Sequence, residues 1–168
     1  MALTLAAVVL VLDQASKWAI LTQGPALGEA IEVTGFFNLV LTYNTGVSFG
    51  LFGGSAAAWK PWALGGLAVA VSAGLLIWLA RQPERWLALS IGLIVGGALG
   101  NALDRAHQPG VVDFLDFHLL GWHWPAFNLA DSAIFLGVAI LVFDGLFWER
   151  VRSKNGANQK KNGIAGEE

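Results

Sequence analysis

The sequence has no cysteine and few charged residues for its length. The absence of cysteine from all 168 residues excludes disulfides, thiolate metal ligands and a cysteine nucleophile. Only 13% of the residues are charged and 55% are hydrophobic. A surface so poor in charge could not face water on all sides. A net charge of -2 also argues against nucleic acid as the main partner. The composition therefore indicates an integral membrane protein, and the length indicates one domain.

Apolar stretches long enough to cross a membrane, which takes roughly 20 residues, occur four times. They cover residues 2–21, 62–80, 86–103 and 126–148. The first stretch is not a typical signal peptide, because it lacks a basic leader and carries Asp13 and Lys17 within the apolar run. We therefore expect an all-α integral membrane protein, with four transmembrane helices in one domain over residues 1–150.

Lysine and arginine are distributed unequally over the segments between the predicted spans. The short turn between the second and third spans carries Arg81 and Arg85, and more basic residues follow the last span: Arg150, Arg152, Lys154, Lys160 and Lys161. The remaining basic residues, Lys17, Lys60 and Arg105, lie near the opposite side. Basic residues favour the cytoplasmic side, so both termini are predicted to be cytoplasmic. Residues 151–168 are predicted to form a disordered basic tail there.

The two long connections, residues 22–61 and 104–125, then face outward. Residues 31–52 are rich in β-branched and aromatic residues separated by glycines, which predicts a small extracytoplasmic β-sheet at the membrane surface. In the third span, Gly92, Gly96 and Gly100 share one helix face. Small residues at this spacing allow a neighbouring helix to approach closely.

Five carboxylates are predicted to gather at the outer membrane boundary: Asp13, Asp104, Asp113, Asp116 and Asp131. Ionisable groups at such a boundary are candidates for function. Asp113 lies in an apolar Val-Val-Asp-Phe segment, and Asp131 lies just inside the fourth span, so the intervening loop allows the two to meet. Two adjacent carboxylates cannot both ionise easily, so one can act as a general acid while the other activates water. The spacing permits this pair without establishing it.

A structural interpretation of the same polar residues also remains open. Asp13 and Lys17 are one helical turn apart and can form an ion pair. Asp104 and Arg105 could pair at the end of the third span, and Asn101 and Asn128 could hydrogen-bond between helices. Asp116 is interpreted as a solvated loop charge.

Other functional classes are less consistent with the pattern. Neither a zinc motif nor a nucleophile elbow occurs, which disfavours metal and serine hydrolases. A proton-coupled transporter would need carboxylates along a path through the bilayer, whereas those of this chain are predicted at one face. A non-catalytic assembly or lipid-binding protein would give no reason for two aspartates in apolar surroundings.

Four separated segments resemble, in order, the motifs of bacterial lipoprotein signal peptidases, the signal peptidase II family of membrane aspartyl peptidases. These segments are Asp13–Trp18, Asn44–Gly50, Gly96–Phe114 and Trp124–Ile134. The resemblance covers roughly residues 8–148. It implies an aspartyl endopeptidase with Asp113 and Asp131 as catalytic residues. It further implies a substrate site lined by Asn44, Asn101, Arg105 and Asn128 and supported by Asp13, Lys17, Gly46 and Asp104.

The resemblance also implies the substrate and its location. The expected substrate is a prolipoprotein whose cysteine carries diacylglyceryl, cleaved just before that cysteine at the outer face of the bacterial inner membrane. No metal or organic cofactor is implied, nor a nucleic-acid partner, and the protein is expected to be a monomer. The first outer loop, with Asn44 and Phe49, is expected to form a cradle over the substrate.

Overall fold

The computed structural model describes residues 1–46 and 59–148. Within these residues, four helices are long and apolar enough to cross a membrane, which confirms the predicted spans. They are α1 (Ala2–Gln23), α2 (Lys60–Arg81), α3 (Arg85–His107) and α4 (Leu129–Phe143), which continues as the π-helix η1 (Asp144–Trp148). The fourth helix begins at Leu129 rather than at residue 126, because the chain before it pairs with a strand through a bridge between Phe127 and Leu115. The predicted tail and Phe49 lie outside the described residues.

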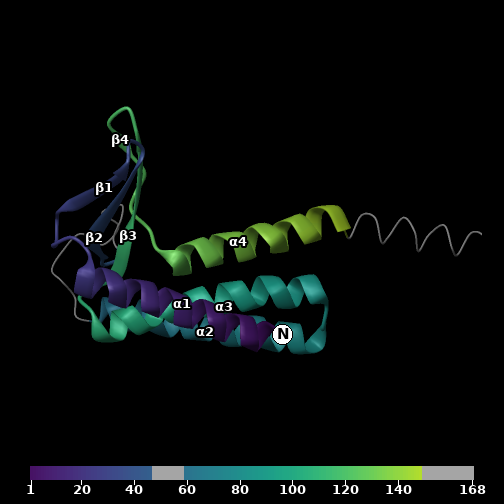
Figure 1. The fold of residues 1–168 in the computed structure, drawn as a ribbon. Coiled ribbons are helices and arrows are strands. Elements are labelled where there is room, and N and C mark those ends of the chain that lie inside the picture. The colour runs from purple at the N-terminus through teal and green to yellow at the C-terminus, as the bar shows by residue number, and fades with distance from the viewer. Residues whose placement is uncertain (47–58, 149–168) are drawn as a thin grey trace, which may run out of the picture.

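The helices run alongside one another, and the β-sheet stands across one end of them (Figure 1). We call this end of the helices the sheet end. Helix α3 is central and contacts α1, α2 and α4. Its apolar residues Leu87, Ile91 and Val95 form the buried core with Ala6 of α1. Because α3 is surrounded in this way, polar residues on its last turns are placed between the other elements.

Glycines of α3 bring its neighbours close at the level of the polar residues. A Cβ atom at Gly96 would lie 2.7 Å from the carbonyl oxygen of Ala6, and one at Gly100 would lie 2.5 Å from Oδ2 of Asp13. The predicted face of small residues therefore faces α1. Gly97 lies on another side of α3, where a Cβ atom would collide with the carbonyl oxygen of Ala130 in α4.

The sheet has four antiparallel strands in the order β1-β2-β3-β4. The strands are β1 (Ala30–Thr34), β2 (Phe37–Asn44), β3 (Val111–Leu119) and β4 (Trp122–His123). The strands predicted within residues 31–52 are thus confirmed as far as Asn44. Strands β3 and β4 were not predicted from the sequence. Strand β3 is buried along Val111–Phe114 without alternation, and this part of the fold brings it into contact with α1 and α3 as well as with β2.

Asp116 is not the solvated loop charge that the sequence suggested. It lies in β3 opposite Asn38 of β2 and is 7% exposed. The carboxylate accepts hydrogen bonds of 2.9 Å from Nδ2 of Asn38 and from Nδ1 of His123. Burial alone would raise the pKa of Asp116. The hydrogen bonds from His123 and Asn38 have the larger, opposite effect, so the pKa lies below its ordinary value. Pairing within the sheet therefore explains why a carboxylate is buried here.

Candidate active site

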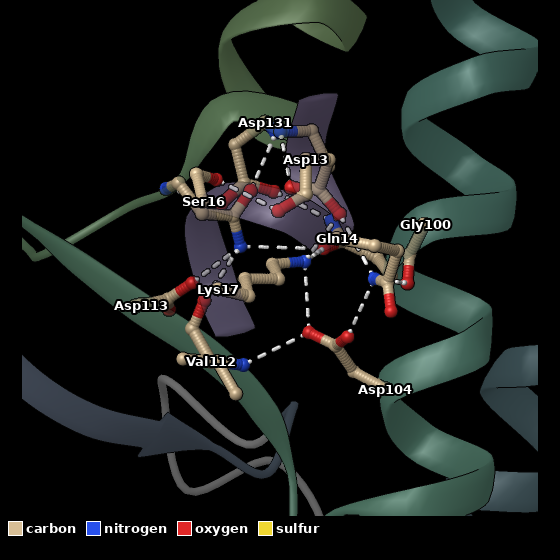
Figure 2. Close-up of polar contacts among 12 residues, drawn as sticks. Asp13, Gln14, Ser16, Lys17, Gly100, Asp104, Val112, Asp113 and Asp131 are labelled. Carbon is tan, nitrogen blue, oxygen red and sulfur yellow. Dashed lines mark hydrogen bonds and ion pairs between the residues drawn. The ribbon is translucent and has the colours of Figure 1, made fainter. Parts of the chain in front are cut away.

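Polar side chains from α1, α3, β3 and α4 converge at the sheet end (Figure 2). Within the described residues, no group of three or more histidine or acidic side chains is arranged to hold a metal ion. The carboxylates are instead joined by amides and by one ammonium group.

Asn128 joins the two aspartates of the predicted pair. Its Oδ1 accepts a hydrogen bond of 2.9 Å from the backbone N–H of Asp131, and its own N–H donates to Oδ2 of Asp131 at 3.3 Å. This reciprocal arrangement is a capping box at the start of α4. The Nδ2 of Asn128 donates to Oδ1 of Asp113 at 2.7 Å. Because Asn128 is fully buried, it holds both carboxylates in fixed positions.

Asp113 lies in β3 and is 2% exposed, and its surroundings shift its pKa strongly. Burial raises its pKa to about 6, and the negative charge of Asp131 adds to this effect. Hydrogen bonds from Asn44 and Asn128 act in the opposite direction without cancelling it. Asp113 therefore takes up a proton near neutral pH, which is what a pair sharing one proton requires.

The raised pKa of Asp113 predicts that Asp113→Asn stabilises the folded protein. In the folded state the charged form is disfavoured, so the wild type loses stability as the pH rises from about 4 to 6 and stays less stable above that range. Asparagine removes this charge and can still accept the hydrogen bond from Asn128. We expect thermal unfolding in detergent to show a gain of about 1–3 kcal/mol at pH 7.5. A gain at pH 7.5 that did not shrink towards pH 4 would contradict this explanation.

Asn101 of α3 connects the pair to a charged cluster. Its Nδ2 donates to Oδ1 of Asp131 at 2.8 Å. Its Oδ1 accepts from Nδ2 of Asn128 at 3.2 Å and from Nζ of Lys17 at 3.0 Å. The predicted contact between Asn101 and Asn128 is therefore confirmed, and each amide also contacts a carboxylate.

The buried ammonium group of Lys17 lies between two carboxylates. Its Nζ is 2.8 Å from Oδ2 of Asp13 and 2.8 Å from Oδ2 of Asp104. The ion pair predicted between Asp13 and Lys17 is therefore confirmed. Asp13 also accepts a hydrogen bond of 2.9 Å from the backbone N–H of Ala130, and Asp104 accepts one of 3.1 Å from that of Val112. This cluster therefore ties α1 and α3 to the segments that carry Asp113 and Asp131.

The ion pair predicted between Asp104 and Arg105 does not form. The side chains of adjacent helical residues point about 100° apart. Asp104 therefore faces Lys17 of α1, and the side chain of Arg105 points away from that ion pair. Arg105 donates from Nη1 to the backbone oxygen of Asn101 at 3.1 Å. Its buried Nε has no hydrogen-bond partner among the described residues. The half-buried guanidinium therefore has donors available for a ligand beside the pair.

Gly46 brings the end of the first loop next to Arg105. Its φ of 81° favours glycine, and its N–H donates to Oδ1 of Asn44 at 2.9 Å. A Cβ atom there would lie 2.5 Å from a methyl carbon of Leu64 and 4.0 Å from Nη2 of Arg105. The side chain of Asn44 lies near enough to Asp113 to lower the pKa of that carboxyl group. All the predicted site residues therefore lie together at the sheet end.

Gln14 belongs to the same cluster, although it was not among the site residues predicted from the sequence. Its Nε2 donates to Oδ1 of Asp104 at 2.9 Å and approaches Oδ2 of Asp13 at 3.2 Å. The available signal was an amide side chain next to Asp13 inside an apolar span.

Comparison with known proteins is consistent with this arrangement. Residues 5–147 match the family described as signal peptidase (SPase) II. Three similar curated proteins are each called a lipoprotein signal peptidase. That of Burkholderia multivorans is 49% identical over 146 residues, which cover 86% of each chain. That of Aeromonas hydrophila subsp. hydrophila is 47% identical and covers 88% of this chain and 89% of its own. That of Ralstonia nicotianae is 48% identical and covers 85% of this chain and 81% of its own.

Two solved structures, both described as a bacterial membrane enzyme determined by the in meso method, share the fold. One has a TM-score of 0.73 and 28% identity, covering 86% of this chain and 87% of its own. The other has a TM-score of 0.75 and 28% identity, covering 87% of this chain and 92% of its own.

Proposed function

The chain belongs to the signal peptidase II family, and on this premise we propose that Asp113 and Asp131 catalyse the removal of signal peptides from prolipoproteins. The enzyme is a lipoprotein signal peptidase, a peptidase of the bacterial membrane. The bond cleaved is the one just before the cysteine that carries diacylglyceryl. The observation that carries the proposal is the pair of carboxylates joined through the buried Asn128, which donates from Nδ2 to Asp113 and from its backbone N–H to Asp131.

The pair supports direct attack by water. The ionised carboxylate takes a proton from a water molecule as its oxygen adds to the scissile carbonyl carbon, and the protonated carboxyl group gives its proton to the carbonyl oxygen. The tetrahedral intermediate then collapses: the C–N bond breaks as the carboxyl group that took the water proton gives it to the leaving nitrogen. The other carboxylate takes back the proton from the former carbonyl oxygen, which restores the pair. No covalent bond to the enzyme forms.

Arg105 and Asn44 are the proposed contacts for the substrate backbone. Arg105 offers N–H donors beside the pair, and Asn44 lies next to Asp113 at the end of β2. Donors of this kind can orient the peptide and stabilise charge on its carbonyl oxygen. The lipid on the substrate would hold the bond at the membrane surface, so that anchoring positions an otherwise ordinary peptide bond.

The orientation in the membrane follows from the basic residues. The turn between α2 and α3 lies at the end of the helices opposite the sheet end (Figure 1), and it carries Arg81 at the end of α2 and Arg85 at the start of α3. If this end is cytoplasmic, both termini are cytoplasmic and the carboxylates lie at the outer face of the inner membrane. The protein would act there as a monomer.

A gel-shift assay tests the proposed substrate. Purified protein in detergent is mixed with a diacylglyceryl-modified prolipoprotein and, in parallel, with the same precursor without lipid. We expect cleavage of the lipidated precursor only. Cleavage of both precursors would show that the enzyme does not need the lipid to recognise its substrate. Cleavage of neither by folded protein would contradict the proposed function.

A further inference from the structure

We propose that Lys17 is a positioning residue that fixes the amide of Asn101 and thereby makes Asp131 the ionised, water-activating member of the pair. This assignment rests on the proposed peptidase function. Lys17 forms no hydrogen bond or ion pair with either aspartate of the pair. It reaches Asp131 through Asn101, which accepts from Nζ of Lys17 and donates to Oδ1 of Asp131. Its positive charge also acts on Asp113 through space and lowers the pKa of that carboxyl group.

The orientation of the Asn101 amide is determined by its neighbours. Its oxygen faces two donors, the ammonium of Lys17 and Nδ2 of Asn128, while its nitrogen faces Oδ1 of Asp131. Rotating the amide by 180° would place its N–H groups against both donors and its oxygen against a carboxylate. Because an ammonium group donates only, Lys17 excludes the rotated amide.

This orientation favours an ionised Asp131. Both of its carboxylate oxygens accept hydrogen bonds, Oδ1 from Asn101 and Oδ2 from the N–H of Asn128. It also lies in the first turn of α4, where the helix dipole stabilises negative charge. Asp113 lies on a strand without such a dipole, and burial raises its pKa to about 6. The shared proton is therefore assigned to Asp113, which makes Asp113 the general acid.

Removing the ammonium group would weaken this preference. The oxygen of Asn101 would then keep only the 3.2 Å hydrogen bond from Nδ2 of Asn128. The amide could therefore rotate more readily and accept a hydrogen bond from a protonated Asp131. The other charged groups around Asp131 come from three elements: Asp13 of α1, Asp104 and Arg105 of α3, and Asp113 of β3. A control must therefore separate the amide of Asn101 from changes elsewhere in this cluster.

The experiment measures kcat/KM against pH for cleavage of the lipidated precursor. Lys17→Met removes the ammonium group. Lys17→Met/Asp104→Asn removes one charge of each sign, and so tests the same contact with the net charge of the cluster unchanged. Gln14→Met is the matched control, because Gln14 contacts Asp13 and Asp104 but not Asn101.

We expect the acid limb of the profile to move to higher pH by about one to two pH units in both Lys17 variants, so that raising the pH restores activity. In Gln14→Met the limb is expected to stay in place, even if the whole curve is lower. Lys17 variants whose curves fall without any movement of the limb would show that Lys17 has only a structural role.

Movement of the alkaline limb alone, with the acid limb unmoved, would show that Lys17 acts directly on Asp113 rather than through Asn101 and would overturn the assignment. A wild-type protein that cleaves at no pH would contradict the proposed function itself. An unmoved acid limb in a cleaving variant would contradict only the role of Lys17.

Discussion

Replacing either aspartate of the pair by asparagine is expected to abolish cleavage. Asparagine keeps the shape of the side chain and can accept the hydrogen bond from Asn128. It cannot take a proton from water as a carboxylate does or deliver one as a carboxylic acid. General acid and general base catalysis each contribute about 10²–10⁴-fold to the rate. When two residues act as a unit, removing one of them also removes the contribution of the other. We therefore expect Asp113→Asn and Asp131→Asn each to lower kcat/KM by roughly 10⁴-fold or more.

Asp116→Asn is the matched control for this prediction. Asp116 lies on the same strand as Asp113, but it contacts Asn38 and His123 rather than the pair. This variant should cleave at a rate within a few fold of the wild type. Circular dichroism would verify that all three variants are folded. Near-normal initial rates for Asp113→Asn or Asp131→Asn would show that the pair is not catalytic.

The second large effect is expected from a single methyl group at Gly97. A Cβ atom there would collide with the carbonyl oxygen of Ala130 and lie 2.8 Å from a side-chain carbon of Ile134. Backbone cannot move aside as a flexible side chain can, so Gly97→Ala should push α4 away from α3. We expect a loss of about 1–3 kcal/mol in the free energy of unfolding.

The same displacement would misplace the pair. Ala130 precedes Asp131, and a shift of about 1 Å at a reacting group can cost roughly 10²-fold in rate. We therefore expect folded Gly97→Ala to cleave tens of times more slowly than the wild type. Gly74→Ala in α2 is the control, because a Cβ atom there meets nothing within 4 Å. Equal stability and activity of the two variants would contradict the packing described for α3 and α4.

The spans were predictable because composition and length alone identify a membrane helix. Close packing on one face of α3 was predictable as well, because Gly92, Gly96 and Gly100 recur there. The sequence did not indicate that α1 is the helix that packs against this face. Strand β3 was not, because its buried residues do not alternate and Asp113 and Asp116 interrupt its apolar pattern. Its position became clear only from its pairing with β2.

The site was predictable in its members and less so in its contacts. Asp113 and Asp131 stand 18 residues apart, and only the cap formed by Asn128 shows how they meet. The pair of Asp13 and Lys17 followed from helical spacing. The ion pair between Asp104 and Lys17 could not be predicted in this way, because it depends on which helix lies beside α3. A choice among partners on different elements is made by packing, which the sequence of one segment does not contain.

The most direct test of the account is the mass of the cleavage products. Folded wild-type protein would be incubated with the lipidated prolipoprotein, and both products weighed by intact mass spectrometry beside a reaction with Asp131→Asn. The account predicts a signal peptide ending just before the cysteine and a mature chain beginning with the diacylglyceryl cysteine, both absent with Asp131→Asn. Cleavage at another bond, or the same products from the variant, would contradict it.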